Sequence, residues 1–286
     1  MLRMFDLCYL CVKFIINMLR AGVKTILFTY LIMISFAGES QGRLDELLAT
    51  TRANEAFVNN AKLEVERIIQ PLLTSHSSDQ KLLRAAFHRM HTNFLKKYEP
   101  YADFNQVFET GTYDCLTATA LLSQLLERLN FRYEIIETNY HIFLIVQTSH
   151  GEVLLETTDR WGGFVTDKDA IAKRIGDYRS NLLASNDSDK KYQYSFKLYQ
   201  AISPEKLTGL LYFNQAVKAF NKHEWINCAS LLETSYKLYE SPRCVELGSV
   251  LIRTVTENSS EEKTKEACLT HLKHLWIKRA ESVAAY

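Results

Sequence analysis

Three residue types in the middle of this chain have the chemistry and the spacing for acyl transfer. Cys115 follows Gly111-Thr-Tyr-Asp at the expected start of a helix, and His141 comes 26 residues later on a β-type run. Glu156 and Asp159 follow His141 by 15 and 18 residues on the next run. A cysteine attacks as its thiolate, an imidazole takes and returns the proton, and a carboxylate orients the imidazole. The order therefore predicts a triad of a cysteine, a histidine and an acid.

The residues before the cysteine suit a nucleophile at the start of a helix. Gly111 permits a tight loop, and either Thr112 or Asp114 could cap the helix. A helix N-terminus favours negative charge and carries N–H groups without intrahelical partners. We therefore expect Cys115 in a first helical turn, where such N–H groups can stabilise an oxyanion.

Hydrophobic periodicity predicts the elements that must position these residues. We expect helices over 43–73, 80–98, 115–129 and 167–178, and strands over 132–138, 140–148, 152–158 and 192–199. The helix from Cys115 is apolar on too many sides for a surface helix, so we expect it to be buried. Trp161-Gly-Gly163 predicts a turn that leaves the sheet.

The second and third strands are predicted to form an antiparallel hairpin around Ser149-His150-Gly151. Simple counting from this turn places His141 opposite residues close to Asp159, with Glu156 a few positions nearer the turn. A bulge or a longer turn would change this pairing. Counting therefore leaves open which of the two acids orients the histidine.

The neighbourhood of the candidate triad resembles a known superfamily over roughly residues 80–165. The matching motifs are Tyr113-Asp-Cys115, Tyr140-His-Ile-Phe-Leu144 and Leu154-Leu-Glu-Thr-Thr-Asp159. They look like the transglutaminase-like superfamily of papain-type cysteine enzymes, in which a cysteine begins the core helix and the histidine and acid lie on the following sheet. Two residues depart from the usual pattern, because Phe143 stands in place of tryptophan and Glu156 in place of aspartate.

The resemblance implies an α+β fold with a buried helix that starts at the cysteine and packs on an antiparallel sheet. It implies Cys115 as nucleophile, His141 as base and Glu156 as acid, with Asp159 as the alternative acid. An active member would act on a peptide or protein amide through a thioester, as a peptidase, an amidase or a cross-linking enzyme. An inactive member would keep the fold and serve as a protein-binding module.

Everything after Pro204 is predicted to be helical. The stretch from Phe213 to Pro242 resembles one tetratricopeptide-type hairpin, in which the small residues Ala216, Cys228 and Ser235 let two helices approach closely. A second, degenerate pair is expected over 244–256 and 261–278. We expect a transglutaminase-like domain over 39–202 and a helical region over 203–286, which packs on that domain and could hold a protein partner.

Residues 1–38 are predicted to be a signal peptide, with Met18 as an alternative start. A basic stretch over 18–24 precedes an uncharged apolar run over 25–36, which is shorter than the roughly 20 residues that span a bilayer. The protein is therefore expected to be periplasmic or secreted, or else anchored in a membrane by this segment if it stays uncleaved. The net charge of +1 argues against nucleic acid as a partner.

No metal or cofactor is expected from the remaining residues. His88 with His91, and His271 with His274, have HxxH spacing but lack further ligands, so solvated helix faces explain them better. Three other cysteines, Cys228, Cys244 and Cys268, could pair in an oxidising compartment, and the sequence does not say which.

Overall fold

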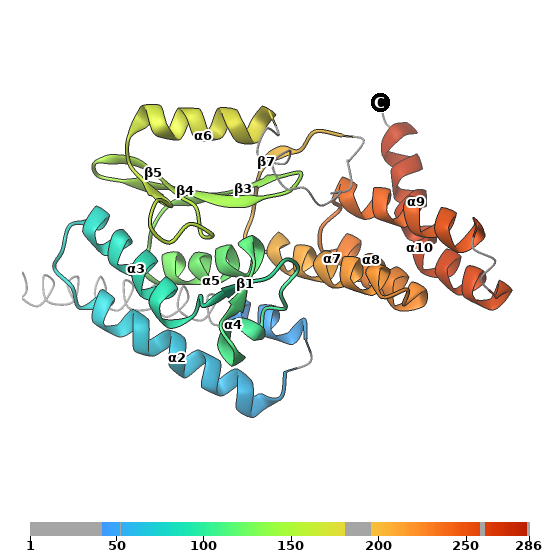
Figure 1. The fold of residues 1–286 in the computed structure, drawn as a ribbon, viewed down its shortest axis with the longest axis horizontal. Coiled ribbons are helices and arrows are strands. Elements are labelled where there is room, and N and C mark those ends of the chain that lie inside the picture. The colour runs from blue at the N-terminus through green and yellow to red at the C-terminus, as the bar shows by residue number, and fades with distance from the viewer. Residues whose placement is uncertain (1–41, 52, 181–195, 258–260, 285–286) are drawn as a thin grey trace, which may run out of the picture. The chain divides into compact units, whose positions relative to one another are not determined.

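The computed structural model describes residues 42–51, 53–180, 196–257 and 261–284. Residues 43–286 form one compact unit of the α+β class, with helices around a five-stranded antiparallel sheet (Figure 1). The predicted signal segment and the start of the strand predicted over 192–199 lie outside the described residues. Among the described helices, none combines the length and the apolar character needed to cross a membrane.

The sheet has the strand order β6-β5-β4-β3-β7. Its strands are β3 (Tyr133–Thr138), β4 (Ile142–Thr148), β5 (Gly151–Leu155), β6 (Phe164–Val165) and β7 (Tyr199–Ile202). The predicted hairpin is confirmed, because Thr148 pairs with Gly151 and Leu144 with Leu155. The prediction over 192–199 was wrong in position, since the described edge strand begins only at Tyr199 and pairs with β3.

Alternate residues of the central strands enter two different hydrophobic layers, as the twofold period of a strand requires. Phe143 and Ile145 pack with Ile171 and Tyr178 of α6 (Lys168–Ser180) on one face. Leu144 and its alternate neighbours pack with α5 (Cys115–Arg128) on the other. Figure 1 shows α6 above the sheet and α5 below it. The predicted buried helix is thus confirmed, and it starts at the cysteine.

The helices before the site differ from the prediction at their ends. A helix over residues 42–49 precedes α2 (Glu55–Leu73), because the Asn54 side chain accepts the Phe57 N–H and caps a new helix there. The next helix, α3 (Asp79–Asn93), stops well before Tyr98. The chain instead forms β1 (Lys97–Tyr98), which pairs in parallel with β2 (Thr112–Tyr113). A short helix, α4 (Gln106–Glu109), lies between these two strands.

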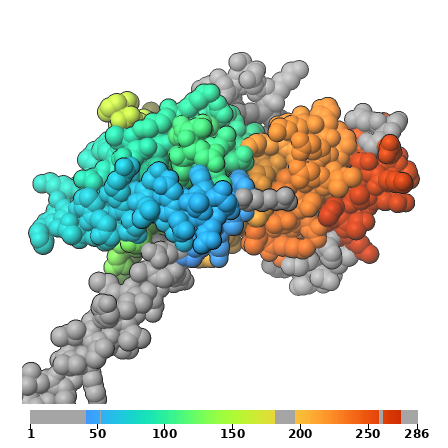
Figure 2. Space-filling model, turned by 90° about the horizontal axis from the view of Figure 1, so that it is seen from below, coloured from blue at the N-terminus to red at the C-terminus, as the bar shows by residue number. Residues whose placement is uncertain are grey.

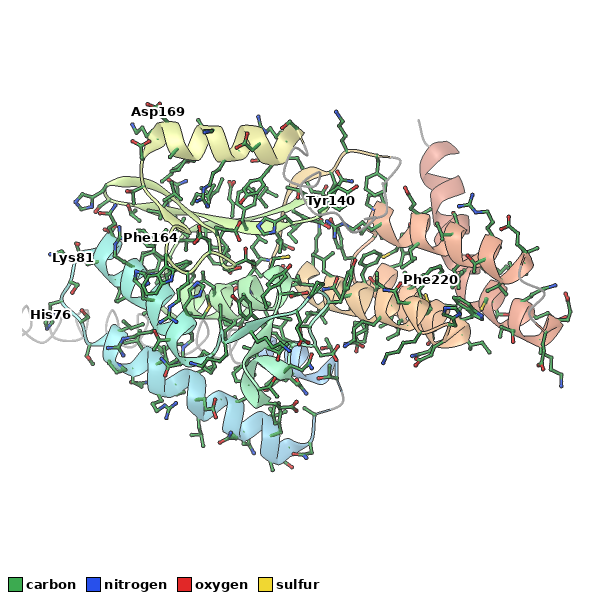
Figure 3. All side chains as sticks on the ribbon, in the orientation of Figure 1. His76, Lys81, Tyr140, Phe164, Asp169 and Phe220 are labelled. Atoms are coloured by element: carbon green, nitrogen blue, oxygen red, sulfur yellow. The ribbon has the colours of Figure 1, made fainter. Side chains whose placement is uncertain are left out.

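The N-terminal helices contact the rest of the unit at two places, the β6 edge of the sheet and helix α7. Phe164 of β6 lies against α3, with its ring centre 6.0 Å from that of Phe87 and 4.1 Å from the Arg84 guanidinium carbon (Figure 3). The segment that ends at residue 51 lies beside the C-terminal helices (Figure 2), where Gln215 donates a 3.1 Å hydrogen bond to the Thr50 carbonyl.

In its described part, the C-terminal region has four helices: α7 (Lys206–Asn221), α8 (Trp225–Leu238), α9 (Pro242–Glu257) and α10 (Glu262–Ala284). The predicted close approach of the first two occurs at Gly209, whose carbonyl accepts a 2.7 Å hydrogen bond from Ser235. A Cβ at Gly209 would lie 2.8 Å from the Cβ of Tyr239. The first turns of α7, through Leu207, Leu210 and Leu211, belong to the same core as α5. The predicted domain boundary near residue 203 stays a prediction.

Candidate active site

The short parallel pair of β1 and β2 positions the segment that leads to Cys115. Gly111 adopts a φ of +74°, and a Cβ there would collide with the Lys96 side chain. The Gly111 carbonyl accepts N–H groups from Lys96 and Lys97 at 2.8 and 3.1 Å. The tight turn predicted at this glycine is therefore confirmed, and it leads through β2 directly to Cys115, which is half-buried at the first position of α5.

Asp114 is the residue that caps the cysteine's helix. Its carboxylate accepts the Thr117 N–H at 2.8 Å, while the Thr117 hydroxyl accepts the Asp114 N–H at 2.9 Å, which completes a capping box. Burial raises the pKa of Asp114 to about 6, although its hydrogen bonds to Thr117 act in the opposite direction. Thr112, the other predicted cap, bonds instead to the Thr110 hydroxyl.

His141 connects the cysteine to one of the two candidate acids. It lies in the turn just before β4, and its Nε2 contacts Glu156 Oε2. Thr157, the residue after Glu156, donates a 3.5 Å hydrogen bond to the Cys115 carbonyl, which places the cysteine beside this pair. The Cys115 side chain also raises the pKa of His141. Because Glu156 occupies Nε2, the other ring nitrogen is the one that can take a proton from the thiol. The His141 side chain is 20% exposed and that of Glu156 only 6%.

Glu156, which directly follows β5, is held by three further donors. Its Oε1 accepts the Thr158 N–H at 3.0 Å and the Thr158 hydroxyl at 2.6 Å. Its Oε2 accepts the Tyr178 hydroxyl at 2.6 Å. These bonds fix a buried carboxylate against the imidazole, as the orienting member of a triad requires. Thr157 lies against the nucleophile's helix, with its hydroxyl 3.4 Å from that of Thr119.

Asp159, the alternative acid, contacts backbone N–H groups of its own turn. Its Oδ1 accepts the N–H groups of Trp161 and Gly162 at 3.2 and 2.8 Å, and its Oδ2 lies 3.5 Å from the Arg174 guanidinium. It therefore stabilises the turn predicted at Trp161-Gly-Gly163. The prediction that this turn leaves the sheet was wrong, because β6 follows it and pairs with β5. The structure brings Cys115, His141 and Glu156 together and leaves Asp159 outside this group.

The histidine and the acid change each other's ionisation. Burial alone would lower the pKa of His141, but the Glu156 carboxylate and hydrogen bonds to Cys115 and Glu156 outweigh it and hold the pKa above its ordinary 6.5. Burial would likewise raise the pKa of Glu156, but the neighbouring imidazolium and its hydrogen bonds hold that pKa below 4.5. The site therefore favours an imidazolium beside a carboxylate.

This pair predicts that the stability difference between the parent protein and a Glu156→Gln variant depends on pH. The contribution is complete between about pH 4.5 and 6.5, where both groups are already charged in the unfolded chain. It is lost as the pH rises through the raised pKa of His141, and also as the pH falls through the lowered pKa of Glu156. Urea unfolding of both proteins across this range measures the difference. A difference that stays constant with pH would contradict the charged pair.

The remaining described cysteines have no comparable surroundings. Cys228, Cys244 and Cys268 are free, buried thiols in the hydrophobic cluster of the C-terminal helices. Burial raises the pKa of Cys228 and of Cys244 to about 12, and it raises that of Cys268 as well. Of the four described cysteines, only Cys115 is partly exposed, and its side chain raises the pKa of an imidazole.

Several residues around the site were not predicted from the sequence. Tyr178 lies within a predicted helix, but nothing in its spacing indicated that it would reach Glu156. Asn214 of α7 donates a 2.9 Å hydrogen bond to Asp114, although 100 residues separate them in the chain. Tyr98 packs against Tyr113, two residues before Cys115, with the ring centres 5.8 Å apart. Burial raises the pKa of Tyr98 and of Tyr101.

Comparison with known proteins identifies no family for this chain. The chain matches no model of a known protein family, and no curated protein sequence matches it. Over the described residues, no group of three or more histidine, cysteine, aspartate or glutamate side chains could hold a metal ion.

Proposed function

We propose that this protein is a cysteine acyl-transfer enzyme with a papain-type, transglutaminase-like core, which acts on an amide of a peptide or protein. One observation carries the proposal: the His141 ring contacts the buried Glu156 carboxylate, while Thr157, the next residue, donates a 3.5 Å hydrogen bond to the Cys115 carbonyl. The Cys115 side chain also raises the pKa of the same ring. A thiol at a helix start, a base on the sheet and an orienting acid are the three parts that covalent acyl transfer needs.

In the proposed reaction the proton of the Cys115 thiol already resides on His141, as the imidazolium that the site favours, and the thiolate sulfur attacks the amide carbonyl carbon. The C–N bond then breaks, the leaving amine takes the proton from His141, and a thioester remains on Cys115. Water or a second amine attacks the thioester, loses a proton through His141 and restores the thiol. Glu156 keeps the imidazole in the orientation that each transfer needs.

The first turn of α5 can stabilise the oxyanion that forms in these steps. The Asp114 cap takes the N–H groups of Leu116 and Thr117. We propose the Cys115 N–H, another of the first amides of the helix, as an oxyanion donor. The product is a hydrolysed one when water accepts the acyl group and a cross-linked one when an amine accepts it. The substrate that is bound, and not these residues, decides between the two.

Labelling with iodoacetamide near neutral pH tests the proposal. We expect Cys115 to react at least about tenfold faster than Cys228, Cys244 and Cys268, because only Cys115 has an adjacent base. Peptide mass spectrometry over a time course gives each rate. Exposure alone would also favour Cys115, so the decisive variant is His141→Ala, which should lower the Cys115 rate by about tenfold or more.

An unchanged Cys115 rate in His141→Ala would overturn the enzymatic proposal. The fold would then be better explained as a non-catalytic module that binds a protein partner. Export also stays a proposal, since it depends on the segment over 1–38, and N-terminal sequencing of the mature protein tests it.

A further inference from the structure

The turn that carries His141 is closed by its own residues. Thr138 and His141 bond reciprocally: the His141 carbonyl accepts the Thr138 N–H at 2.8 Å, and the Thr138 hydroxyl lies 3.0 Å from both the His141 N–H and its carbonyl. Asn139 joins this turn to the segment before β7, through 2.8 Å bonds to the Phe196 carbonyl and the Leu198 N–H. The position of the imidazole is therefore set by a four-residue turn.

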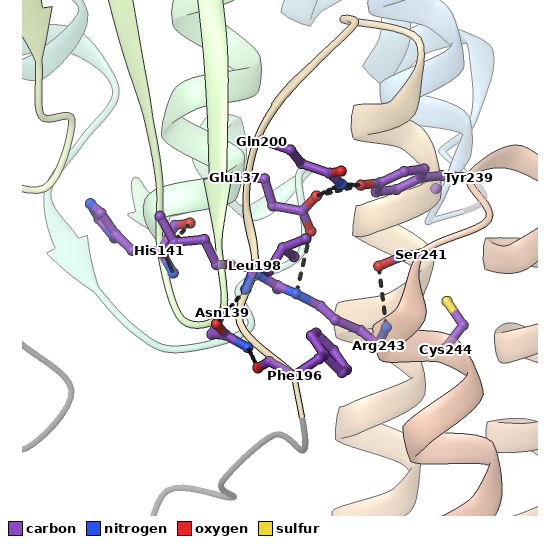
Figure 4. Close-up of polar contacts among 12 residues, drawn as sticks. Glu137, Asn139, His141, Phe196, Leu198, Gln200, Tyr239, Ser241, Arg243 and Cys244 are labelled. Carbon is purple, nitrogen blue, oxygen red and sulfur yellow. Dashed lines mark hydrogen bonds and ion pairs between the residues drawn. The ribbon is translucent and has the colours of Figure 1, made fainter. Parts of the chain in front are cut away.

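A guanidinium from the C-terminal helices reaches the same turn. Arg243, in the first turn of α9, donates from one terminal nitrogen to the Thr138 carbonyl. Its Nε lies 3.3 Å from Oε1 of Glu137, the preceding residue of β3 (Figure 4). A planar guanidinium presents several N–H groups in fixed directions, so one side chain can hold both partners at once.

Glu137 explains why this cation must stay in place. The Glu137 side chain is 1% exposed and that of Arg243 is 12% exposed. The hydroxyl of Tyr239, the residue after α8, and the Gln200 amide of β7 donate hydrogen bonds to the other carboxylate oxygen of Glu137, Oε2 (Figure 4). A buried charge of this kind is tolerated only when it is paired and hydrogen-bonded. The network therefore anchors the junction of α8 and α9 to the strand that leads into the histidine turn.

The C-terminal helices reach the nucleophile as well. Asn214 of α7 bonds Asp114, the cap immediately before Cys115, and Lys218 of the same helix lies 2.5 Å from Asp103. The helices thus contact both the segment that presents the thiol and the turn that presents the imidazole.

We infer that Arg243 is a positioning residue for His141, and that the C-terminal helices are a working part of the active site. Arg243 acts through Thr138: it holds the turn whose carbonyl and hydroxyl fix the His141 backbone, and so keeps the imidazole between Cys115 and Glu156. A small displacement of a catalytic group has a large effect on rate, because reacting atoms must meet in a narrow range of geometry. This inference rests on the proposed function.

Two variants of the full chain test it, with p-nitrophenyl acetate as the probe that acylates Cys115. Arg243→Lys keeps a cation beside Glu137 but loses the fixed second N–H toward Thr138. The double variant Glu137→Gln with Arg243→Met removes both charges, so that no unpaired buried charge remains. We expect each to slow acylation by at least about tenfold and to move the alkaline limb of its pH profile to lower pH, because a looser turn weakens the bond from His141 to Glu156.

The matched control is Arg253→Met, which removes an exposed arginine from the same helix and should keep the parent rate and profile. If the double variant folds and retains the parent rate and profile, the pair only stabilises the fold and the inference is overturned. If the double variant does not fold, the rate and profile of Arg243→Lys decide in the same way. A parent protein in which Cys115 is not acylated at all would overturn the proposed function, and this inference with it.

Discussion

Glu156→Gln is expected to slow the acylation of Cys115 by at least about a hundredfold, whereas Asp159→Asn should stay within about twofold of the parent rate. Both substitutions remove one negative charge from the segment after β5, and the two residues are only three positions apart. Glu156 bonds the His141 ring, while Asp159 bonds backbone N–H groups of its own turn. Only the first substitution removes the group that orients the base.

The measurement is the burst of nitrophenolate from p-nitrophenyl acetate, with the acyl group located on Cys115 by mass spectrometry. Cys115→Ala supplies the background rate. Thermal unfolding of both variants separates a loss of chemistry from a loss of fold, since Glu156 also bonds Tyr178 and Thr158. A larger loss in Asp159→Asn than in Glu156→Gln would mean that the acid has been misassigned.

Gly163→Ala is expected to destabilise the protein by about 3 kcal/mol, as forced overpacking does, and to displace Glu156, the proposed acid of the site. A Cβ at this position would collide with the carbonyl oxygens of Glu156 and Asp159, which are backbone atoms and cannot rotate away. Gly163 also closes the turn on both sides: its carbonyl accepts the Glu156 N–H and its N–H donates to the Asp159 carbonyl, each at 2.8 Å. Any shift of Gly163 therefore moves Glu156.

Gly176→Ala is the matched control, because it lies exposed in α6 with nothing within 4 Å of a Cβ. This change should stabilise the protein by about 0.5–1 kcal/mol, since alanine loses less conformational freedom than glycine in a helix. Urea unfolding of the two variants gives both free energies of unfolding. Equal free energies of unfolding for the two alanine variants would show that the turn accommodates a Cβ at Gly163 without loss of stability.

The local sequence determined the elements that carry the site. The break at Gly111, the broad apolar character of the segment after Cys115, and the hairpin at Ser149-His150-Gly151 each depend on a few neighbouring residues. Such patterns can be recognised in the sequence alone, because the periods of helices and strands follow from backbone geometry. The buried helix that starts at the cysteine was predicted on this basis, whereas the α+β class was implied by the resemblance to a known superfamily.

The tertiary structure decided which acid faces the histidine. Counting from the hairpin placed His141 opposite residues close to Asp159 but left the choice of acid open. In the structure β5 ends at Leu155 and the chain then turns. Past the last paired residue, a side chain's direction follows from the turn and no longer from strand register. The donors from Tyr178 and Thr158 gather around Glu156, and the first of these comes from a helix 22 residues away.

The sequence by itself determined a thiol at a helix start, an imidazole and two carboxylates in an order that suits acyl transfer. Only the tertiary structure selected Glu156, set Asp159 to hold a turn, and brought Asn214 and Arg243 from the C-terminal helices to the nucleophile and the histidine turn. The physical reason is distance along the chain. Local patterns encode elements, whereas contacts across about 100 residues form only when packed cores bring those elements together.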